Sequence, residues 1–200
     1  MSILAILIAY LLGAIPFGYL LTKWKTGKDI QQLGSGNIGA TNVLRTAGRA
    51  LGIATLLLDI AKGFAALWIA ARLTGNSPIA ESLAALAVIA GHAYPVFLRF
   101  QGGKAVATFT GAFLFIAPLP LLATAIVFVV VVTVSRYISL GSILSAGLFP
   151  LALLLIDHPE TPLLLAAIVG GAFLIWRHKE NIHRLRAGNE NVLRLGGKRT

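Results

Sequence analysis

The sequence predicts an all-α integral membrane protein with about seven transmembrane helices, some of them short. Hydrophobic residues make up 57% of the 200-residue chain and charged residues only 12%. A soluble domain is roughly 45–50% apolar and about 25% charged. The mean hydropathy is +0.84. Since no polar stretch is long enough for a separate soluble domain, residues 1–200 are expected to form a single transmembrane domain. The absence of cysteine excludes disulfides and cysteine-ligated metals.

Seven apolar windows divide the chain. The first two can cross a hydrocarbon core of about 30 Å, which needs about 20 helical residues. The fourth has 13 residues, or about 20 Å of helix. Residues 105–135 are therefore either two short helices that meet at Pro118 and Pro120 or a re-entrant pair. The first window has no basic leader and no cleavage site, so we expect a retained span rather than a signal peptide. The windows lie at roughly 2–22, 50–71, 82–98, 105–117, 119–135, 141–156 and 162–176.

The basic residues predict the orientation of these helices, because cytoplasmic loops carry an excess of Lys and Arg. Fifteen of the 17 basic residues fall in loops on one side, seven of them in the tail from Arg177 to Arg199. The two exceptions are Lys62, inside the second window, and Arg72, at its far end. We therefore expect the N-terminus outside, the C-terminus in the cytoplasm and the basic loops at the cytoplasmic face.

The polar segment 33–45 separates the first two windows. Its glycines let backbone N–H groups come close to a ligand. A helix that starts near Gly39 would place Thr41 and Arg45 on one face, with its positive end towards the loop. Two interpretations stay open: a phosphate cradle at a membrane surface, or a flexible loop with a solvated arginine. The segment's glycines and polar side chains that can contact an anion are Gly34, Gly36, Gly39, Ser35, Asn37, Thr41 and Asn42.

A second polar segment follows the third window. Pro95 is expected to kink or end the helix of that window, and Gly102 and Gly103 predict a turn. A helix beginning after this turn would carry Lys104 in its first turn and Thr108 one turn later, which suits a phosphoryl group. The alternative is that Lys104 only anchors the helix at the interface. His92 lies in an apolar stretch and is interpreted as a hydrogen-bonded packing residue.

The third segment, 177–190, lies in the tail. On a helix, His178, Asn181 and Leu185 share one stripe, while Arg177 and Arg184 lie on another. A basic amphipathic tail on anionic lipid is the alternative, although the pairing of His and Asn favours a site.

Two further features complete the candidates. Ser139 and Ser142 open the sixth window near the basic loops and can donate to a phosphate. Asp59 and Lys62 lie three residues apart inside the second window. Because they can neutralise each other, we interpret this pair as structural although intramembrane charges are functional candidates.

Several familiar motifs are rejected. Residues 34–39 match G-x-G-x-x-G, but no strand precedes them and no βαβ unit is present, so a dinucleotide fold is excluded. The phosphate-binding P-loop, the His-x₄-Asp acyltransferase motif and H-E-x-x-H are all missing. We therefore expect no metal and no cofactor, and no nucleic acid as a partner.

Taken together, the three segments resemble the bacterial membrane acyl-phosphate:glycerol-3-phosphate acyltransferases. The motifs are Gly-Ser-Gly-Asn-x-Gly-Ala-Thr-Asn at 34–42 with Arg45; Gly-His-x-Tyr-Pro at 91–95 with Gly-Gly-Lys at 102–104; and Arg-His-x-x-Asn-Ile-x-Arg-Leu-x-x-Gly-x-Glu at 177–190. The resemblance covers nearly the whole chain. Gln101 stands where the family commonly has a basic residue, and Ala105 where it commonly has glycine, which restricts the turn after Lys104.

The resemblance implies transfer of a fatty acyl group from acyl phosphate to the sn-1 hydroxyl of glycerol 3-phosphate, at the cytoplasmic face of the bacterial inner membrane. The products are lysophosphatidic acid and inorganic phosphate. The proton acceptor is either His178 or a bound phosphate dianion, and the second is preferred. The alternative function is a small multi-span transporter of an organic phosphate. Membrane lipid is an expected partner, and a monomer is the working expectation for the oligomeric state.

The implied catalytic residues are Ser35, Arg45, Lys104 and His178. The implied substrate-binding residues are Gly34, Gly36, Asn37, Thr41, Asn42, Gly102, Gly103, Thr108, Ser142, Asn181 and Glu190.

Overall fold

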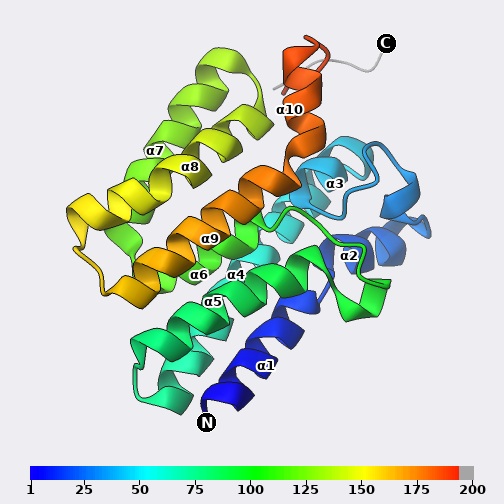
Figure 1. The fold of residues 1–200 in the computed structure, drawn as a ribbon. Helices are drawn as coiled ribbons and strands as arrows, with labels where there is room; N and C mark the ends of the chain where they lie inside the picture. The colour runs from blue at the N-terminus through cyan, green and yellow to red at the C-terminus, as the bar shows by residue number, and fades with distance from the viewer. Residues whose placement is uncertain (194–200) are drawn as a thin grey trace, which may run out of the picture.

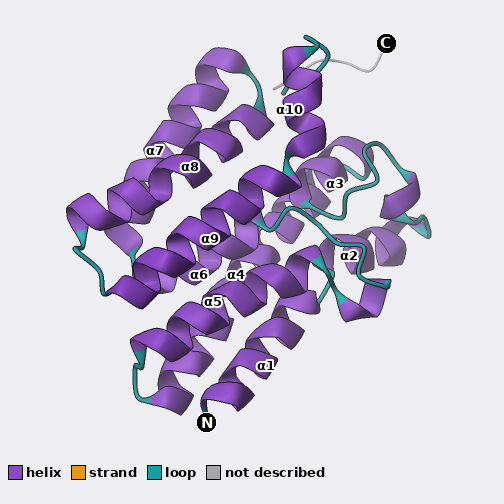
Figure 2. Ribbon diagram, in the orientation of Figure 1, coloured by secondary structure: helices purple, strands orange, loops and turns teal. Residues whose placement is uncertain are grey.

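The computed structural model describes residues 1–193, and the regular structure in this part of the chain is helical throughout (Figure 2). Ten α-helices and two short 3₁₀ helices (η1 and η2) follow one another there. In order they are α1 (Ser2–Ala14), α2 (Phe17–Thr26), η1 (Ile30–Gln32), α3 (Ala40–Thr46), α4 (Arg49–Thr74), α5 (Pro78–Ala93), η2 (Val96–Leu98), α6 (Val106–Ile116), α7 (Pro118–Ser135), α8 (Ile138–Ile156), α9 (Thr161–Arg177) and α10 (Lys179–Arg186).

Each of the seven predicted apolar windows is largely helical, but the windows differ in their ability to cross a membrane. Helices α9 and α10 are long and apolar enough to cross a membrane only when taken together, as one span bent by 55°. Helix α6 has 11 residues, which reach about 17 Å. Length and composition therefore support five or six crossings, and the seventh stays a prediction. The five long apolar segments in the described chain are Ser2–Thr26, Arg49–Thr74, Pro78–Leu98, Pro118–Ser135 and Ile138–Ile156.

The first window is divided at Ile15 and Pro16, which separate α1 from α2. Proline has no backbone N–H, so the helical hydrogen-bond ladder is interrupted there. Lys62 of α4 stabilises the break, because its Nζ donates to the Ile15 carbonyl at 2.8 Å. The same Nζ lies 2.9 Å from Asp59 Oδ1, with both side chains buried. These contacts support the structural interpretation of the Asp59–Lys62 pair.

Helices that are distant in the sequence lie side by side in the bundle (Figure 1). Helix α1 packs along α5 and α4, α6 packs along α4, and α7, α8 and α9 follow as neighbours. Glycines allow the closest of these contacts. A Cβ at Gly63 would collide with the Thr108 carbonyl, and one at Gly111 with the Ile60 carbonyl. Small residues at such contacts let helices approach closely where lipid offers no hydrophobic driving force between them.

The segment 105–135 forms two helices that are separated at Ala117, directly before Pro118. Helix α6 packs on α4 in the centre of the bundle, whereas α7 packs mainly on α8 at its edge. Phe109 and Phe113 of α6 are buried against Phe149 of α8, with ring centroids 5.1 Å and 4.6 Å away. This core fixes the start of α6, and with it the segment that carries Lys104.

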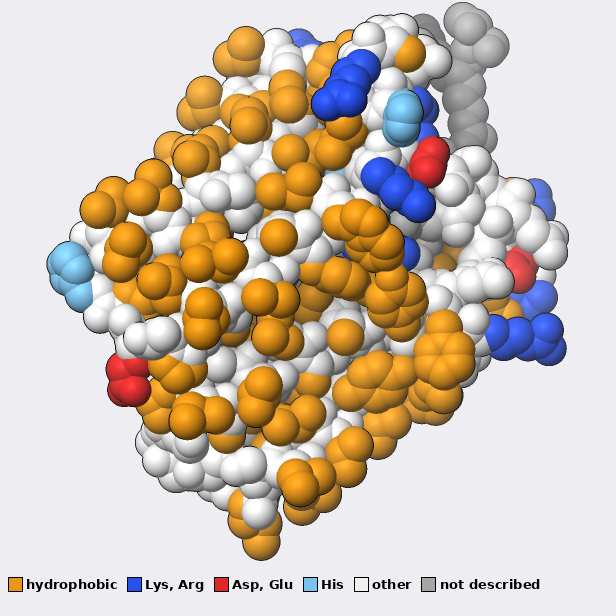
Figure 3. All heavy atoms as spheres, in the orientation of Figure 1, with side chains coloured by type: hydrophobic (Ala, Val, Ile, Leu, Met, Phe, Trp, Pro, Cys, Tyr) orange, Lys and Arg blue, Asp and Glu red, His pale blue; other side chains and the backbone are white. Residues whose placement is uncertain are grey.

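The basic loops gather at the end of the bundle that carries α2, α3 and α10 (Figure 1). Figure 3 shows Lys and Arg concentrated at that end, while hydrophobic side chains cover most of the remaining face. Three of the tail's basic residues, Arg194, Lys198 and Arg199, lie outside the described residues.

Candidate functional site

An open cavity of about 230 Å³ lies where the three motif segments meet. The first segment contributes Ser35 and Asn37, the second Lys104, and the third segment with the end of α9 the rest. Four of the eight lining side chains are cationic, so the cavity suits an anion. The three motif segments, which were identified separately in the sequence, meet in the fold at this cavity. The lining residues are Ser35, Asn37, Lys104, Trp176, Arg177, Lys179, Glu180 and Arg184.

A chain of hydrogen bonds connects Lys104 to the tail. Lys104 Nζ donates to Asn181 Oδ1, and Asn181 Nδ2 donates to Glu190 Oε1 at 2.8 Å. Glu190 Oε2 accepts from Arg184 Nε, also at 2.8 Å, and Ser139 Oγ of α8 donates to Oε1 at 3.2 Å. The ammonium of Lys104 is thus oriented by a neutral amide, and its charge stays available for a ligand. Glu190 is buried, and its carboxylate is engaged within the chain, where it holds the segment after α10 in place.

The two predicted phosphate-binding cations share one electrostatic environment. Burial and, to a smaller extent, the charge of Arg184 lower the pKa of Lys104 to about 8, and Glu190 opposes this shift. Burial also lowers the pKa of Arg45, Glu190 raises it and Arg184 lowers it. Arg45 keeps its charge because a guanidinium is not deprotonated in proteins. Arg45 is not among the residues that line the cavity. The charges of Glu190 and Arg184 nevertheless shift the pKa of both Lys104 and Arg45, so the two cations lie near the same charged side chains.

Asn42 organises the first loop from inside. Its Oδ1 accepts from the Ser35 N–H at 3.1 Å, and its Nδ2 donates to the Leu33 and Asn37 carbonyls, both at 2.9 Å. Gly34 has a φ of 57°, and a Cβ there would collide with Asn42 Oδ1. The buried amide is therefore used within the loop, where it holds Ser35 and Asn37 at the cavity.

The short helix predicted after Gly39 is confirmed as α3. Gly39 is its N-terminal cap, and its N–H donates to Asn37 Oδ1 at 2.8 Å. Thr41 and Arg45 lie one turn apart on this helix. Gly36 has a φ of 69°, which a residue with a side chain rarely adopts. The backbone of the loop thus requires glycines in places where the motif has them.

Gly102 and Gly103 pack the second loop against the end of α5. Their N–H groups donate to the carbonyls of Ala93 and His92, at 3.2 Å and 3.1 Å. A Cβ at Gly103 would collide with the His92 ring. The two glycine N–H groups are therefore engaged within the chain, and the role of this turn is to carry Lys104.

Thr108 lies deeper than the cavity. It is fully buried, and its Oγ1 is 3.1 Å from His92 Nδ1. The same nitrogen is 3.6 Å from Asp59 Oδ1. This supports the interpretation of His92 as a packing residue, and it places Thr108 in the polar contact between α5 and α6.

Two other predicted residues have contacts within their own helices. Ser142 Oγ donates to the Ile138 carbonyl of α8 at 3.0 Å. His178, buried between α9 and α10, has its Nδ1 at 2.7 Å from the Leu174 carbonyl. Because a carbonyl only accepts hydrogen bonds, Nδ1 carries the proton, and Nε2 is the nitrogen that can take up another.

The sequence analysis did not select five of the residues that line the cavity: Trp176, Arg177, Lys179, Glu180 and Arg184. Arg177 donates to the carbonyls of Gly102 and Gly103, and Arg184 binds Glu190. The available signal was the i, i+7 spacing of Arg177 and Arg184, which predicts that both cations lie on one helical stripe.

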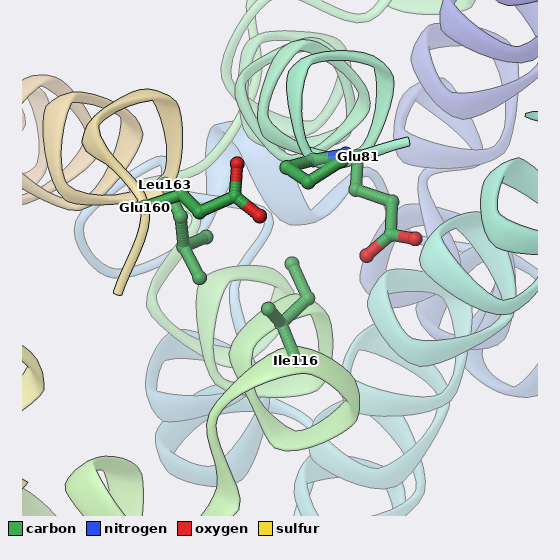
Figure 4. Close-up of a pocket in the computed structure, with 5 residues that line it drawn as sticks. Glu81, Ile116, Glu160 and Leu163 are labelled. Atoms are coloured by element: carbon green, nitrogen blue, oxygen red, sulfur yellow. The ribbon is translucent and has the colours of Figure 1, made fainter. Parts of the chain in front are cut away.

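The opposite end of the bundle carries acidic rather than basic side chains around its hollow. A hollow of about 150 Å³ there is lined by Pro78, Glu81, Ile116, Glu160 and Leu163. Figure 4 shows Glu81 and Glu160 reaching it from α5 and from the turn before α9, with Ile116 across from them. Two carboxylates repel phosphate, so the anion site belongs to the basic end.

A family model described as glycerol-3-phosphate acyltransferase matches residues 3–188. A glycerol-3-phosphate acyltransferase of Desulforamulus reducens is 46% identical over 199 residues, which cover 100% of this chain and 98% of the relative. A protein of the same description from Geotalea daltonii is 46% identical and covers 96% of this chain and 98% of its own.

Two crystal structures of PlsY (YgiH), an integral membrane glycerol 3-phosphate acyltransferase, are similar to this fold. The glycerol 3-phosphate form has a TM-score of 0.91 and 39% sequence identity, and the match covers 96% of both chains. The lysophosphatidic acid form has a TM-score of 0.87 and 38% identity, covering 96% of this chain and 94% of the other.

Proposed function

The chain belongs to the glycerol-3-phosphate acyltransferase family, and we propose that it transfers a fatty acyl group from acyl phosphate to the sn-1 hydroxyl of glycerol 3-phosphate. The observation that carries the proposal is the single cavity in which Ser35, Asn37, Lys104 and Arg184 meet from three segments. It is a multi-pass membrane enzyme, and the products are lysophosphatidic acid and inorganic phosphate.

The reaction needs little more than positioning and charge stabilisation. The hydroxyl oxygen forms a bond to the acyl carbon, the bond from that carbon to the phosphate oxygen breaks, and phosphate leaves with the electron pair. Lys104 and Arg45 hold phosphate groups and stabilise the negative charge that develops in the transition state. Ser35, Asn37 and Thr41 orient the substrate oxygens.

The remaining residues support these groups. Asn42 shapes the first loop, Gly102 and Gly103 carry Lys104, and Glu190 anchors Asn181. We assign Asn181 and His178 to the acceptor side, behind the residues that line the cavity. Thr108 and Ser142 act through the packing of α6 and α8.

The hydroxyl proton has two possible acceptors. A bound phosphate dianion can take it, because an acyl phosphate is already activated and positioning suffices. The alternative is His178, whose Nδ1 is occupied by the Leu174 carbonyl and whose Nε2 can accept the proton. We propose the phosphate.

An acyl phosphate is a better match for this site than a coenzyme A thioester. The cavity of about 230 Å³ is smaller than the roughly 300–1,000 Å³ that is usual for drug-sized ligands. A phosphate with its adjoining glycerol or acyl carbonyl fits that scale, whereas a thioester donor brings an adenine nucleotide that needs its own surface.

The setting in the membrane is part of the proposal. We place the cavity at the cytoplasmic face of the bacterial inner membrane, with seven crossings, the N-terminus outside, the C-terminus inside, one domain over residues 1–200, and a monomer as the active form. The gathering of basic side chains at one end of the bundle (Figure 3) supports this orientation. A transporter of an organic phosphate is not favoured, because the buried charges Asp59 and Lys62 contact each other rather than a path through the bundle.

The test is a donor comparison with purified protein. Palmitoyl phosphate and palmitoyl coenzyme A are supplied separately at matched concentration with glycerol 3-phosphate, and lysophosphatidic acid is measured. We expect product with palmitoyl phosphate, together with equimolar phosphate release. Comparable turnover with the thioester would overturn the assignment of the donor.

A further inference from the structure

The turn before Lys104 is held from two sides. The N–H groups of Gly102 and Gly103 bind the last carbonyls of α5, and the carbonyls of the same two glycines bind Arg177. Arg177 Nη2 donates to the Gly102 carbonyl at 3.2 Å and to the Gly103 carbonyl at 2.9 Å, and Nε donates to Gly103 at 3.2 Å. One guanidinium therefore engages both peptide oxygens that directly precede Lys104.

The guanidinium has a further contact that fixes its plane. Its Cζ lies 5.3 Å from the centre of the Tyr94 ring, a cation–π distance. Tyr94 is itself tied to α1, because its carbonyl accepts from Tyr10 Oη at 2.8 Å. Three donated hydrogen bonds and a ring contact direct this arginine towards the protein, although it lines a cavity suited to anions.

Arg177 also stands at the hinge between the two helices of the third segment. It is the last residue of α9, and α10, which carries Asn181, starts at Lys179 after a bend of 55°. Lys104 Nζ binds Asn181. Arg177 thus connects the backbone that carries Lys104 to the helix junction that carries its partner.

We propose that Arg177 is a positioning residue, whose guanidinium fixes the Gly102–Gly103 turn so that the Lys104 ammonium reaches Asn181 and the cavity. The inference rests on the proposed function, because it assigns Lys104 to the substrate phosphate. A planar guanidinium can bind two carbonyls and stack on Tyr94 at once; a lysine ammonium in the same place is a point charge and cannot.

Kinetics of Arg177→Lys and Arg177→Gln test the proposal, with Arg186→Lys and Arg186→Gln as matched controls. Arg186 is an exposed arginine on α10. We expect both Arg177 variants to lower kcat about 10- to 100-fold, the scale of a small misplacement of a reacting group. Both Arg186 variants should stay within about 2-fold, as surface changes usually do. Retained kcat in Arg177→Lys, with Arg177→Gln raising only KM, would assign Arg177 to direct phosphate binding and overturn the proposal.

A double-mutant cycle separates positioning from an independent role. If Arg177 acts through Lys104, adding Arg177→Gln to Lys104→Ala should lower kcat by no more than about 2-fold relative to Lys104→Ala alone, because the effects of coupled residues are not additive. A double variant whose loss of kcat is the product of the two single losses would contradict the proposal.

A measurement without turnover keeps the inference separate from the proposed function. Amine-reactive labelling of Lys104, followed by peptide mass spectrometry, should accelerate in Arg177→Gln and not in Arg186→Gln, because the released turn exposes the ammonium. An unchanged labelling rate would contradict the positioning role even in an inactive preparation. A wild-type protein that forms no lysophosphatidic acid would instead overturn the proposed function.

Discussion

Lys104 Nζ donates a hydrogen bond to Asn181 Oδ1 across 77 positions of sequence. The contact joins the second motif segment to the third, and Ser35 and Asn37 of the first segment line the same cavity as Lys104. Because the partner is a neutral amide, the ammonium is oriented without being neutralised. A charge held in this way suits a site that must bind a phosphate and then release it.

The first prediction concerns the two cations that we propose bind phosphate. Lys104→Ala and Arg45→Ala should each lower turnover by about 100-fold or more, the scale for losing a group that meets developing charge. Arg99→Ala is the matched control, because Arg99 is exposed and does not line the cavity; it should change turnover only a few-fold. Equal losses in all three variants, measured as phosphate release, would favour a general basic surface over specific contacts.

The second prediction is a pH dependence of glycerol 3-phosphate binding. Burial lowers the pKa of Lys104 to about 8, so the ammonium loses its proton as the pH rises through that value. The substrate phosphate does not change in this range, because its second pKa is about 6. KM for glycerol 3-phosphate should therefore rise between about pH 7 and pH 9.5, the interval around the pKa of about 8.

Lys104→Arg is the control for this pH dependence, because a guanidinium keeps its charge throughout. The KM of this variant should stay constant over the same pH range, whatever its absolute value. An equal dependence of KM on pH in both proteins would assign the effect to another group.

The lowered pKa of Lys104 also affects the stability of the protein. The unfolded chain binds more protons than the folded one between a pH of about 8 and the ordinary pKa of lysine, so Lys104 makes the free energy of unfolding rise with pH in that interval.

The third prediction concerns Ala105, which has a φ of 63°. This left-handed conformation costs a residue with a Cβ about 1–2 kcal/mol, whereas the buried methyl group contributes about 0.8 kcal/mol. Ala105→Gly should therefore increase the free energy of unfolding slightly. Ala112→Gly, at a buried position inside α6, should decrease it by about 1 kcal/mol. Thermal unfolding in detergent compares the two, and destabilisation by both would show that the turn is not strained.

The fourth prediction is the topology. The chain contains no cysteine, so single introduced cysteines report without background. Cysteines at Ser35, Gln101 and Asn189 should react only from the cytoplasmic side, and those at Asn76 and Glu160 only from outside; all five positions are exposed. A membrane-impermeant thiol reagent on oriented vesicles measures this, and outside labelling at position 189 would contradict seven crossings.

The sequence by itself determined the helical membrane class, the positions of the apolar segments, and the three segments that form the site. These depend on local properties. Hydropathy over about 20 residues decides whether a helix can lie in lipid, and the helix start considered near Gly39 agrees with the observed start of α3 at Ala40. The motif residues Ser35, Asn37, Lys104 and Asn181 were likewise evident from their types and spacing.

Only the tertiary structure decided what each polar side chain contacts. Asn42 and Ser35 both carry donors, yet Asn42 is buried within its own loop while Ser35 lines the cavity. Arg177 has the charge of a phosphate ligand, but the Gly102 and Gly103 carbonyls lie within its reach because α9 ends beside the second loop. Hydrogen bonds form at about 3 Å, so the partner of a side chain depends on which distant backbone the packing of the helices brings to that distance.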